Sequence, residues 1–255
     1  MALTSKDKIC IPPPLFHCFG LVLGNLAVFT HGATAVYASE TFNPGEVLKV
    51  VCQEKCTGLH GVPTMFVAEL DHPDFGKYDY SSLRYFDLYK EAHNRTGIAA
   101  GASVPAKLME RIHKRLNLTG LTICYGLIPT GLCLRSGMTE TSPVSYQTTL
   151  HSPLQKRIET VGTILPHTRA KIVKPGTTDV LPVGQRGELC VSGYLLQKGY
   201  WENEEKTREV MVKDEEGRVW MMTGDEGSMD KDGYLSITGR IKDIIIRGIS
   251  FRLFI

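Results

Sequence analysis

The first 150 residues alternate short apolar runs with longer amphipathic stretches. The apolar runs are short enough to be β-strands and lie at residues 9–11, 33–37, 59–62, 97–100 and 121–124. The intervening stretches are long enough for helices of about ten residues. Strands that alternate with such helices predict βαβ units and a parallel sheet.

Four helices are expected between these strands. An apolar helix should follow Gly20 and lie buried, and a second should begin at Asn43-Pro44, a cap residue followed by a first-turn proline. The second helix carries Val47, Leu48 and Val51 on one face. Pro63-Thr64 opens a third helix, and a fourth is expected over residues 105–116.

The pattern changes after residue 161. Short strands at residues 170–173, 187–191 and 219–222 are separated by turns rich in Gly and Pro. This arrangement predicts an antiparallel or β-barrel-like subdomain, with its boundary near residues 148–155. We therefore expect an α/β fold: an α/β subdomain over 1–150, a β-rich subdomain over 151–240 and a short terminal segment over 241–255.

A β-hairpin is expected around the polar turn at residues 230–233. Asp and Gly supply the side-chain bonds and the positive φ that such a turn needs. Folding about these four residues places Asp225 opposite Thr238, about 7 Å from the position of Arg240. A carboxylate there could accept two hydrogen bonds from a vicinal diol such as a ribose. The alternative, which the hairpin alone favours, is a surface ion pair.

Composition narrows the classes of function. The chain has 255 residues, 42% hydrophobic and 22% charged, which is typical of a globular protein with a substantial core. A net charge of +2 gives no electrostatic argument for nucleic acid or an anionic membrane. Seven scattered cysteines indicate reduced thiols and an intracellular location, with cytoplasm, mitochondrion and peroxisome left open. The most apolar run, residues 15–29, is too short and too polar to span a bilayer.

Two motifs near the end of the chain resemble the adenylate-forming (AMP-binding) superfamily, which includes acyl-CoA synthetases, luciferases and peptide-synthetase adenylation domains. They are Thr223-Gly224-Asp225 and Gly239-Arg240-Ile241-Lys242-Asp243. The resemblance implies that Asp225 binds the ribose hydroxyls of ATP and that Arg240 supports them. It also implies that Ile237 packs on the adenosine and that Lys242 is the hinge to a small C-terminal domain.

Further matches to this superfamily extend over most of the chain. The segment 13–17 and the aromatic residues after it resemble the border of the acyl pocket, which gives roles to His17 and Phe19. A strand end of small residues resembles the part that lies against adenine: Gly101, Ala102 and Ser103. Small residues suit that place because a flat base needs close backbone approach.

The remaining matches concern the adenine ring and the phosphates. Tyr125, followed by Gly126, resembles the aromatic residue that stacks on adenine. Thr139 matches a phosphate-binding hydroxyl, and Glu140 matches the carboxylate that holds Mg²⁺ on ATP, a role that suits a hard oxygen ligand. Without the resemblance, His17 and Tyr125 would be read as core residues and Glu140 as a solvated charge.

The sequence departs from the superfamily pattern in four places. The Ser/Thr/Gly-rich phosphate loop, expected upstream of residue 1, is absent, and the C-terminal domain is replaced by residues 249–255. Eleven residues, 127–137, separate Tyr125-Gly126 from Thr139-Glu140, and another eleven, 85–95, interrupt a second matched segment. One hypothesis explains both interruptions as retained intron sequence, and the alternative is a diverged pseudoenzyme.

The resemblance implies an ATP-dependent acyl-CoA ligase that uses ATP, Mg²⁺ and CoA and converts a carboxylic acid, expected to be a fatty acid, first to acyl-AMP and then to acyl-CoA. The sequence at residues 103–105 and 138–144 is most similar to that of medium-chain fatty acyl-CoA synthetases. This chain itself is expected to be a fragment with weak or no activity. The alternatives are a binding-only pseudoenzyme fragment and an adenylation domain of the peptide-synthetase or luciferase type.

Overall fold

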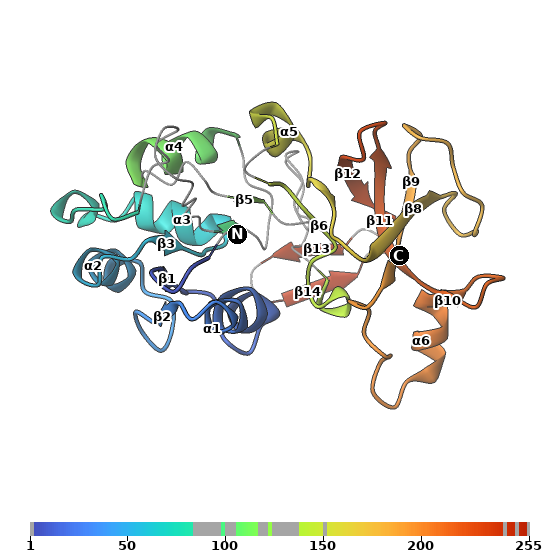
Figure 1. Ribbon diagram of the computed structural model, residues 1–255, viewed down its shortest axis with the longest axis horizontal. Helices are drawn as coiled ribbons and strands as arrows, with labels where there is room; N and C mark the ends of the chain where they lie inside the picture. Colours follow the sequence, from blue (N-terminus) through green and yellow to red (C-terminus); the bar gives the residue numbers. More distant parts are fainter. Residues whose placement is uncertain are drawn as a thin grey trace.

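The structure is a computed structural model that describes residues 3–83, 98–99, 106–116, 122–123, 138–149, 152–241, 244–247 and 250–253. Figure 1 shows two halves: helices around short strands in one, and a twisted antiparallel sheet in the other. The expectation of an α/β fold in which a mostly parallel part precedes a β-rich part is confirmed.

Parallel strands organise the first half. β1 (Lys8–Cys10) lies between β2 (Thr34–Val36) and β3 (Gly58–Leu59), and both pairings are parallel. A second parallel pair joins β4 (Ile98–Ala99) to β5 (Thr122–Ile123). All five strands overlap the apolar runs that the sequence pattern assigns to them, although β1 and β3 each begin one residue earlier.

Local sequence signals explain where helices of this half form. In α2 (Pro44–Gln53), Oδ1 of Asn43 accepts a hydrogen bond from the backbone N of Glu46 at 3.1 Å, as expected for a cap residue before proline. The predicted inner face of α2, Val47, Leu48 and Val51, is buried. The other helices are α3 (Pro63–Leu70), η2 (Phe75–Lys77) and α4 (Ala106–Leu116).

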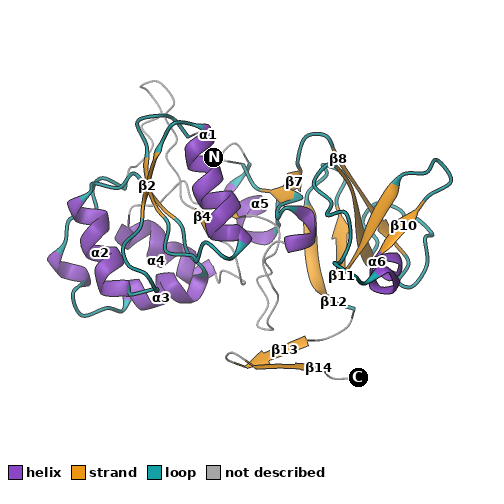
Figure 2. Cartoon of the chain, turned by 90° about the horizontal axis from the view of Figure 1, so that it is seen from below, coloured by secondary structure: helices purple, strands orange, loops and turns teal. Residues whose placement is uncertain are grey.

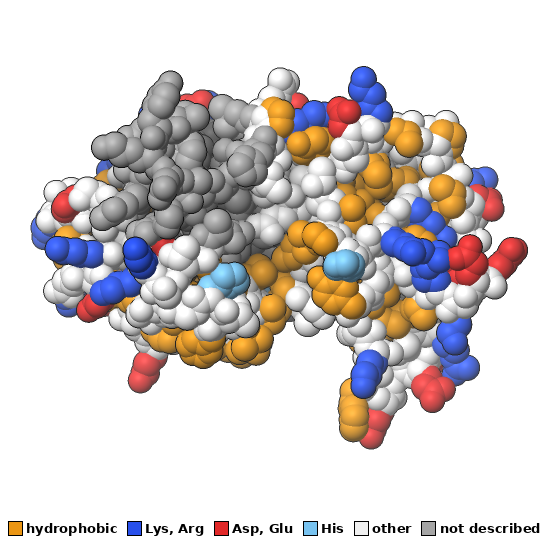
Figure 3. All heavy atoms as spheres, viewed as in Figure 1, with side chains coloured by type: hydrophobic (Ala, Val, Ile, Leu, Met, Phe, Trp, Pro, Cys, Tyr) orange, Lys and Arg blue, Asp and Glu red, His pale blue; other side chains and the backbone are white. Residues whose placement is uncertain are grey.

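The expectation of a buried apolar helix after Gly20 is only half right. The segment forms a π-helical stretch, η1 (Phe19–Leu26), continued by α1 (Ala27–Thr30). Phe19, Gly24 and Val28 are buried, whereas Leu21, Leu26 and Phe29 are 42%, 47% and 61% exposed. Figure 3 shows apolar side chains gathered along the lower edge of this half, over the helix that Figure 1 labels α1. Hydrophobicity all round a helix predicts burial all round, but one face of this helix has no partner among the described residues.

An antiparallel sheet forms the second half. Its strands are β8 (Thr168–Val173), β9 (Gly187–Gly193), β10 (Met211–Lys213), β11 (Val219–Met229) and β12 (Leu235–Arg240). The order is β10-β11-β9-β8, and β12 pairs with the second part of β11. The sheet of described strands is open, so the expected barrel-like shape is not a closed barrel.

Short elements connect and surround the two halves. They are η3 (Thr139–Thr141), β6 (Tyr146–Gln147), α5 (Leu154–Glu159), β7 (Thr163–Ile164) and α6 (Glu204–Val210). Val144 belongs to the core of the first half, and Tyr146 belongs to the core of the second. The β6–β7 pair spans residue 150, where the sequence places a domain boundary. That boundary remains a prediction.

The end of the chain forms a separate hairpin. β13 (Ile244–Arg247) pairs antiparallel with β14 (Ser250–Leu253), and Figure 2 shows the pair standing away from the larger sheet. Across the described part of the chain, no helix combines the length and the apolar character needed to cross a lipid bilayer.

Candidate functional site

The register of the β11–β12 hairpin places Asp225 directly opposite Arg240. The expectation that Asp225 lies opposite Thr238 is therefore wrong, for two reasons. The turn holds five residues, since Met229 pairs with Leu235. In addition, Gly227 pairs with Ile237 but Glu226 pairs with Gly239, so Thr238 is an extra residue, a β-bulge. Each effect shifts the register by one residue. Together they place the carboxylate of Asp225 opposite the guanidinium of Arg240.

A second bulge, which includes Asp225, lies on the opposite edge of β11, where β11 pairs with β9. Met222 pairs with Cys190 and Glu226 pairs with Glu188, so the three residues Thr223-Gly224-Asp225 lie opposite Leu189 alone. Gly224 adopts φ +70°, a conformation that glycine adopts without steric cost. Bulges of this kind re-aim side chains and occur next to active sites.

Side-chain hydrogen bonds stabilise this bulge, where the backbone pairing between β11 and β9 is interrupted. Thr223 Oγ1 donates to the carbonyl oxygen of Leu189 at 2.8 Å and accepts from the backbone N of Asp225 at 3.1 Å. Glu188 Oε1 accepts from the backbone N of Gly224 at 3.0 Å. Residue Glu188 of β9 therefore supports the motif 223–225, because its carboxylate binds the backbone of the bulge.

Asp225 and Arg240 form an ion pair that is mostly shielded from water. Arg240 Nε lies 2.6 Å from Asp225 Oδ1, and the side chains are 21% and 9% exposed. The contact is close, but the N–H does not point along the hydrogen-bond direction. Charge attraction thus holds a buried carboxylate in a fixed position at the open end of the hairpin.

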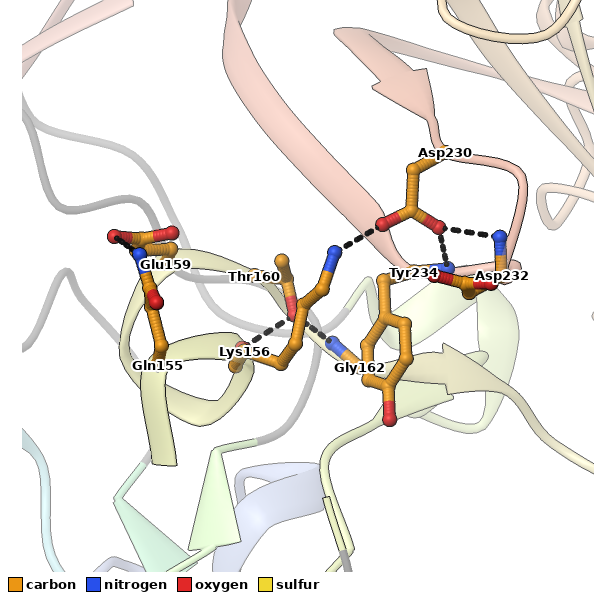
Figure 4. A network of polar contacts seen from close by, with 8 residues as sticks. All are labelled: Gln155, Lys156, Glu159, Thr160, Gly162, Asp230, Asp232 and Tyr234. Atoms are coloured by element: carbon orange, nitrogen blue, oxygen red, sulfur yellow. Dashed lines mark hydrogen bonds and ion pairs between the residues drawn. The ribbon is translucent and has the colours of Figure 1, made fainter. Parts of the chain in front are cut away.

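The other end of the hairpin is anchored to α5, as Figure 4 shows. Asp230 Oδ1 accepts hydrogen bonds from the backbone N of Asp232 and of Tyr234, both at 2.9 Å, and Oδ2 contacts Lys156 Nζ. Lys156 Nζ also lies 5.1 Å from the centre of the Tyr234 ring. The backbone of Leu235 pairs with Gly162, whose φ of +90° and close approach to Gln147 leave no space for a side chain. These contacts fix where the turn begins, and hence the register that opposes Asp225 and Arg240.

A second group of predicted residues lies at η3. Glu140 is half-buried, and its Oε1 accepts a hydrogen bond from the phenol of Tyr200 at 2.9 Å. The backbone N of Gln197 donates to the carbonyl oxygen of Glu140 at 2.9 Å. Burial, and then the hydrogen bond to Glu140, raise the pKa of Tyr200 to about 12, so the phenol keeps its proton and acts as a donor at neutral pH.

The acyl-pocket segment lies beside the same η3. Cys18 Sγ is 3.9 Å from Thr139 Oγ1 and 3.8 Å from His17 Nδ1. His17 is exposed, and its Nδ1 also accepts from the backbone N of Phe19 at 3.0 Å, so it is not a core histidine. The structure therefore brings together two segments about 120 residues apart in the chain, both of which the resemblance assigns to the substrate site.

Two predicted contact residues are buried in the cores. Phe19 is 2% exposed and stacks on His60 with the ring centres 5.8 Å apart, and Ile237 is 7% exposed in the core of the β-rich half. Their proposed contacts with acyl chain and adenosine remain predictions. The other predicted residues lie outside the described part of the chain: Gly101, Ala102, Ser103, Tyr125, Gly126 and Lys242. The two eleven-residue interruptions lie there too.

Sequence reasoning missed the side chains that support the predicted ones. The sequence patterns above give no role to Glu188, Tyr200 or Cys18. No local pattern could pair Tyr200 with Glu140, since 60 residues separate them. The one available signal was that the resemblance to the superfamily extends over most of the chain and so includes both segments.

The donor set around Glu140 fits a magnesium ion bound to phosphates. Such an ion is usually held by one or two carboxylates together with phosphate oxygens and water, not by a cage of protein ligands. Tyr200 uses Oε1 of Glu140, which leaves Oε2 for a cation. Among the residues that the structure describes, no three His, Cys, Asp or Glu side chains gather closely enough to hold a metal by themselves.

Comparison with known proteins identifies relatives of the chain. A family model described as AMP-binding enzyme matches residues 1–201. Acyl-CoA ligase sidI from Aspergillus fumigatus is 50% identical over 248 residues, which are 97% of this chain and 38% of that protein. The mitochondrial medium-chain acyl-CoA ligase ACSF2 from Danio rerio is 39% identical over 241 residues, 94% of this chain and 36% of that protein.

The fold comparison gives the same result. The crystal structure of ATP-bound MatB from Rhodopseudomonas palustris superposes with a TM-score of 0.73 at 25% identity, covering 98% of this chain and 43% of that one. The chain thus spans about two fifths of the length of the proteins it matches. With a family model that covers most of its length, the chain belongs to the family of AMP-binding enzymes.

Proposed function

We propose that this chain forms the nucleotide- and acid-binding part of an ATP-dependent acyl-CoA ligase that activates a carboxylic acid, with a fatty acid as the expected substrate. The observation that carries the proposal is the opposition of Asp225 and Arg240 in the hairpin, in a chain 50% identical to a named acyl-CoA ligase. The ion pair holds the carboxylate in one orientation, and a carboxylate can accept hydrogen bonds from the two hydroxyls of a ribose.

The proposed reaction has two steps. The fatty acid carboxylate attacks the α-phosphorus of ATP, forming acyl-AMP and releasing pyrophosphate, and the CoA thiolate then displaces AMP to give the thioester. Glu140 would hold Mg²⁺ on the phosphates, and Thr139 would donate its hydroxyl to a phosphate oxygen. His17 and Phe19 would border the acid, beside Thr139. Such catalysis relies on positioning and charge neutralisation.

The residues outside the described part complete the proposed site. Tyr125 with Gly126 would stack on adenine, Gly101, Ala102 and Ser103 would lie against its plane, and Lys242 would act as a hinge. Ile237, which the structure describes, would pack on the adenosine. The five cysteines that the structure describes are free thiols, and we infer an intracellular compartment on that basis.

Fatty-acid-dependent exchange between pyrophosphate and ATP tests this proposal. We expect weak exchange by the chain, because residues 127–137 separate Tyr125 from Thr139, and a misplacement of about 1 Å can cost about 100-fold in rate. Deleting residues 127–137 should raise the exchange rate by about that factor, whereas deleting residues 176–178, in an exposed turn of the β-rich half, should not. AMP binding without any exchange in either form would instead support a binding-only protein.

A further inference from the structure

We infer that Tyr200 is a positioning residue, which aims the carboxylate of Glu140 at the magnesium ion. This inference rests on the proposed function and adds to it a residue to which that function assigns no contact with nucleotide or acid. Its basis is the 2.9 Å hydrogen bond from the phenol to Glu140 Oε1, between side chains 60 residues apart in the chain.

Glu140 is held from one side by a single loop. The backbone N of Gln197 donates to the carbonyl oxygen of Glu140, and Tyr200, three residues further on, donates to its carboxylate. The loop therefore fixes both the backbone position and the side-chain direction of residue 140. A glutamate with only its backbone fixed would keep three freely rotating side-chain bonds. Metal binding would then have to restrict these rotations, at a cost in conformational entropy.

The loop is itself anchored to α6. The backbone N of Tyr200 donates to Thr207 Oγ1 at 2.8 Å, and Thr207 Oγ1 donates to the carbonyl oxygen of Asn203 at 2.8 Å. Asn203 caps α6, with its Oδ1 accepting from the backbone N of Lys206 at 3.0 Å. Gly199 permits this close approach, because a Cβ there would lie 3.0 Å from Thr207 Cγ2. The backbone of Tyr200, which carries the phenol, is thus anchored to the start of α6.

The bond geometry suits a positioning role. The phenol is a donor only to Oε1, so it restrains the carboxylate without occupying Oε2. Partners that orient a metal-binding side chain typically contribute about 10- to 100-fold to metal affinity. Removing the hydroxyl and keeping the ring should therefore affect magnesium binding more than nucleotide binding.

The experiment compares the wild-type chain with Tyr200→Phe by calorimetry, using AMP without metal and ATP over a series of Mg²⁺ concentrations. We expect an unchanged AMP affinity and at least about a 10-fold rise in the Mg²⁺ concentration that gives half of the metal-dependent gain in ATP affinity. Glu140→Gln should remove most of that gain. Tyr194→Phe, a change in the same region at a side chain 74% exposed, is the matched control and should behave as wild type.

Two results would overturn the inference while leaving the proposed function standing. One is a Tyr200→Phe protein with the Mg²⁺ dependence of the wild type. The other is an equal loss of AMP and ATP affinity in that variant, which would mark a purely structural role. If the wild-type chain binds no AMP at all, the proposed function fails first and the inference fails with it.

Discussion

Glu69 shows how a single buried carboxylate can set the pH dependence of stability. It lies on α3 at 0% exposure, and neither of its carboxylate oxygens has a hydrogen-bond partner among the described residues. Burial raises the pKa of Glu69 well above its ordinary value. The folded state therefore keeps a proton that the unfolded chain loses near its ordinary pKa of 4.5.

The sign of the effect follows from this proton difference. Between pH 4.5 and the raised pKa, the folded state binds more protons than the unfolded state, so stability falls as the pH rises, by up to about 1.4 kcal/mol per pH unit. Glu69→Met has a similar shape and no charge. We expect it to raise the free energy of unfolding by about 1–3 kcal/mol at neutral pH, and by less near pH 4.5.

Urea unfolding at several pH values measures this difference. Glu40→Met, at an exposed position, is the control and should show no such pH-dependent gain. A Glu69→Met protein that is less stable than wild type at pH 8 would show that the carboxylate has a stabilising partner, contrary to the description above.

At the scale of elements, the β11–β12 hairpin matters most, because its register sets the site. The turn that begins the hairpin depends on Asp230, whose Oδ1 accepts two backbone hydrogen bonds and whose Oδ2 contacts Lys156. The Lys156 and Asp230 side chains are 34% and 33% exposed, so their ion pair should contribute at most about 1 kcal/mol. The backbone bonds should contribute more, since a charged acceptor makes each of them stronger.

We therefore expect a graded series at position 230. Asp230→Ala should lower the free energy of unfolding by about 1–3 kcal/mol, because it leaves two backbone N–H groups without their acceptor. Asp230→Asn keeps an acceptor oxygen and should cost about 1 kcal/mol or less, similar to Lys156→Met. Denaturant unfolding gives these values, and an Asn variant as damaged as the Ala variant would show that the ion pair dominates instead.

At the scale of the whole molecule, the fold could be predicted from the sequence where its signals are local. Asn43 caps a helix by its own side chain, and Asp230 with Gly233 marks a turn, so both features appear where expected, although the turn is one residue longer than predicted. The alternation of strand and helix also predicts the parallel pairing of β1 with its neighbours.

The parts that could not be predicted depend on contacts across the chain. Thr238 looks like any strand residue, so nothing local marks it as the bulge that opposes Asp225 and Arg240. The exposed face of η1 and α1 has the same apolar composition as its buried face. The bond from Tyr200 to Glu140 exists only after both halves have folded, and so only the structure shows it.

The most direct test of the account is whether the chain recognises the ribose diol of a nucleotide through Asp225. Calorimetry would compare AMP with 2′,3′-dideoxy-AMP on the wild type, on Asp225→Ala and on Asp232→Ala, an exposed aspartate in the turn of the same hairpin. We expect AMP to bind the wild type and Asp232→Ala about 10- to 100-fold more tightly than the dideoxy compound, the contribution of hydrogen bonds to a charged acceptor. Asp225→Ala should bind the two compounds equally. Equal binding of both compounds by the wild type would contradict the account, since the Asp225–Arg240 pair would then be a structural ion pair and not a nucleotide site.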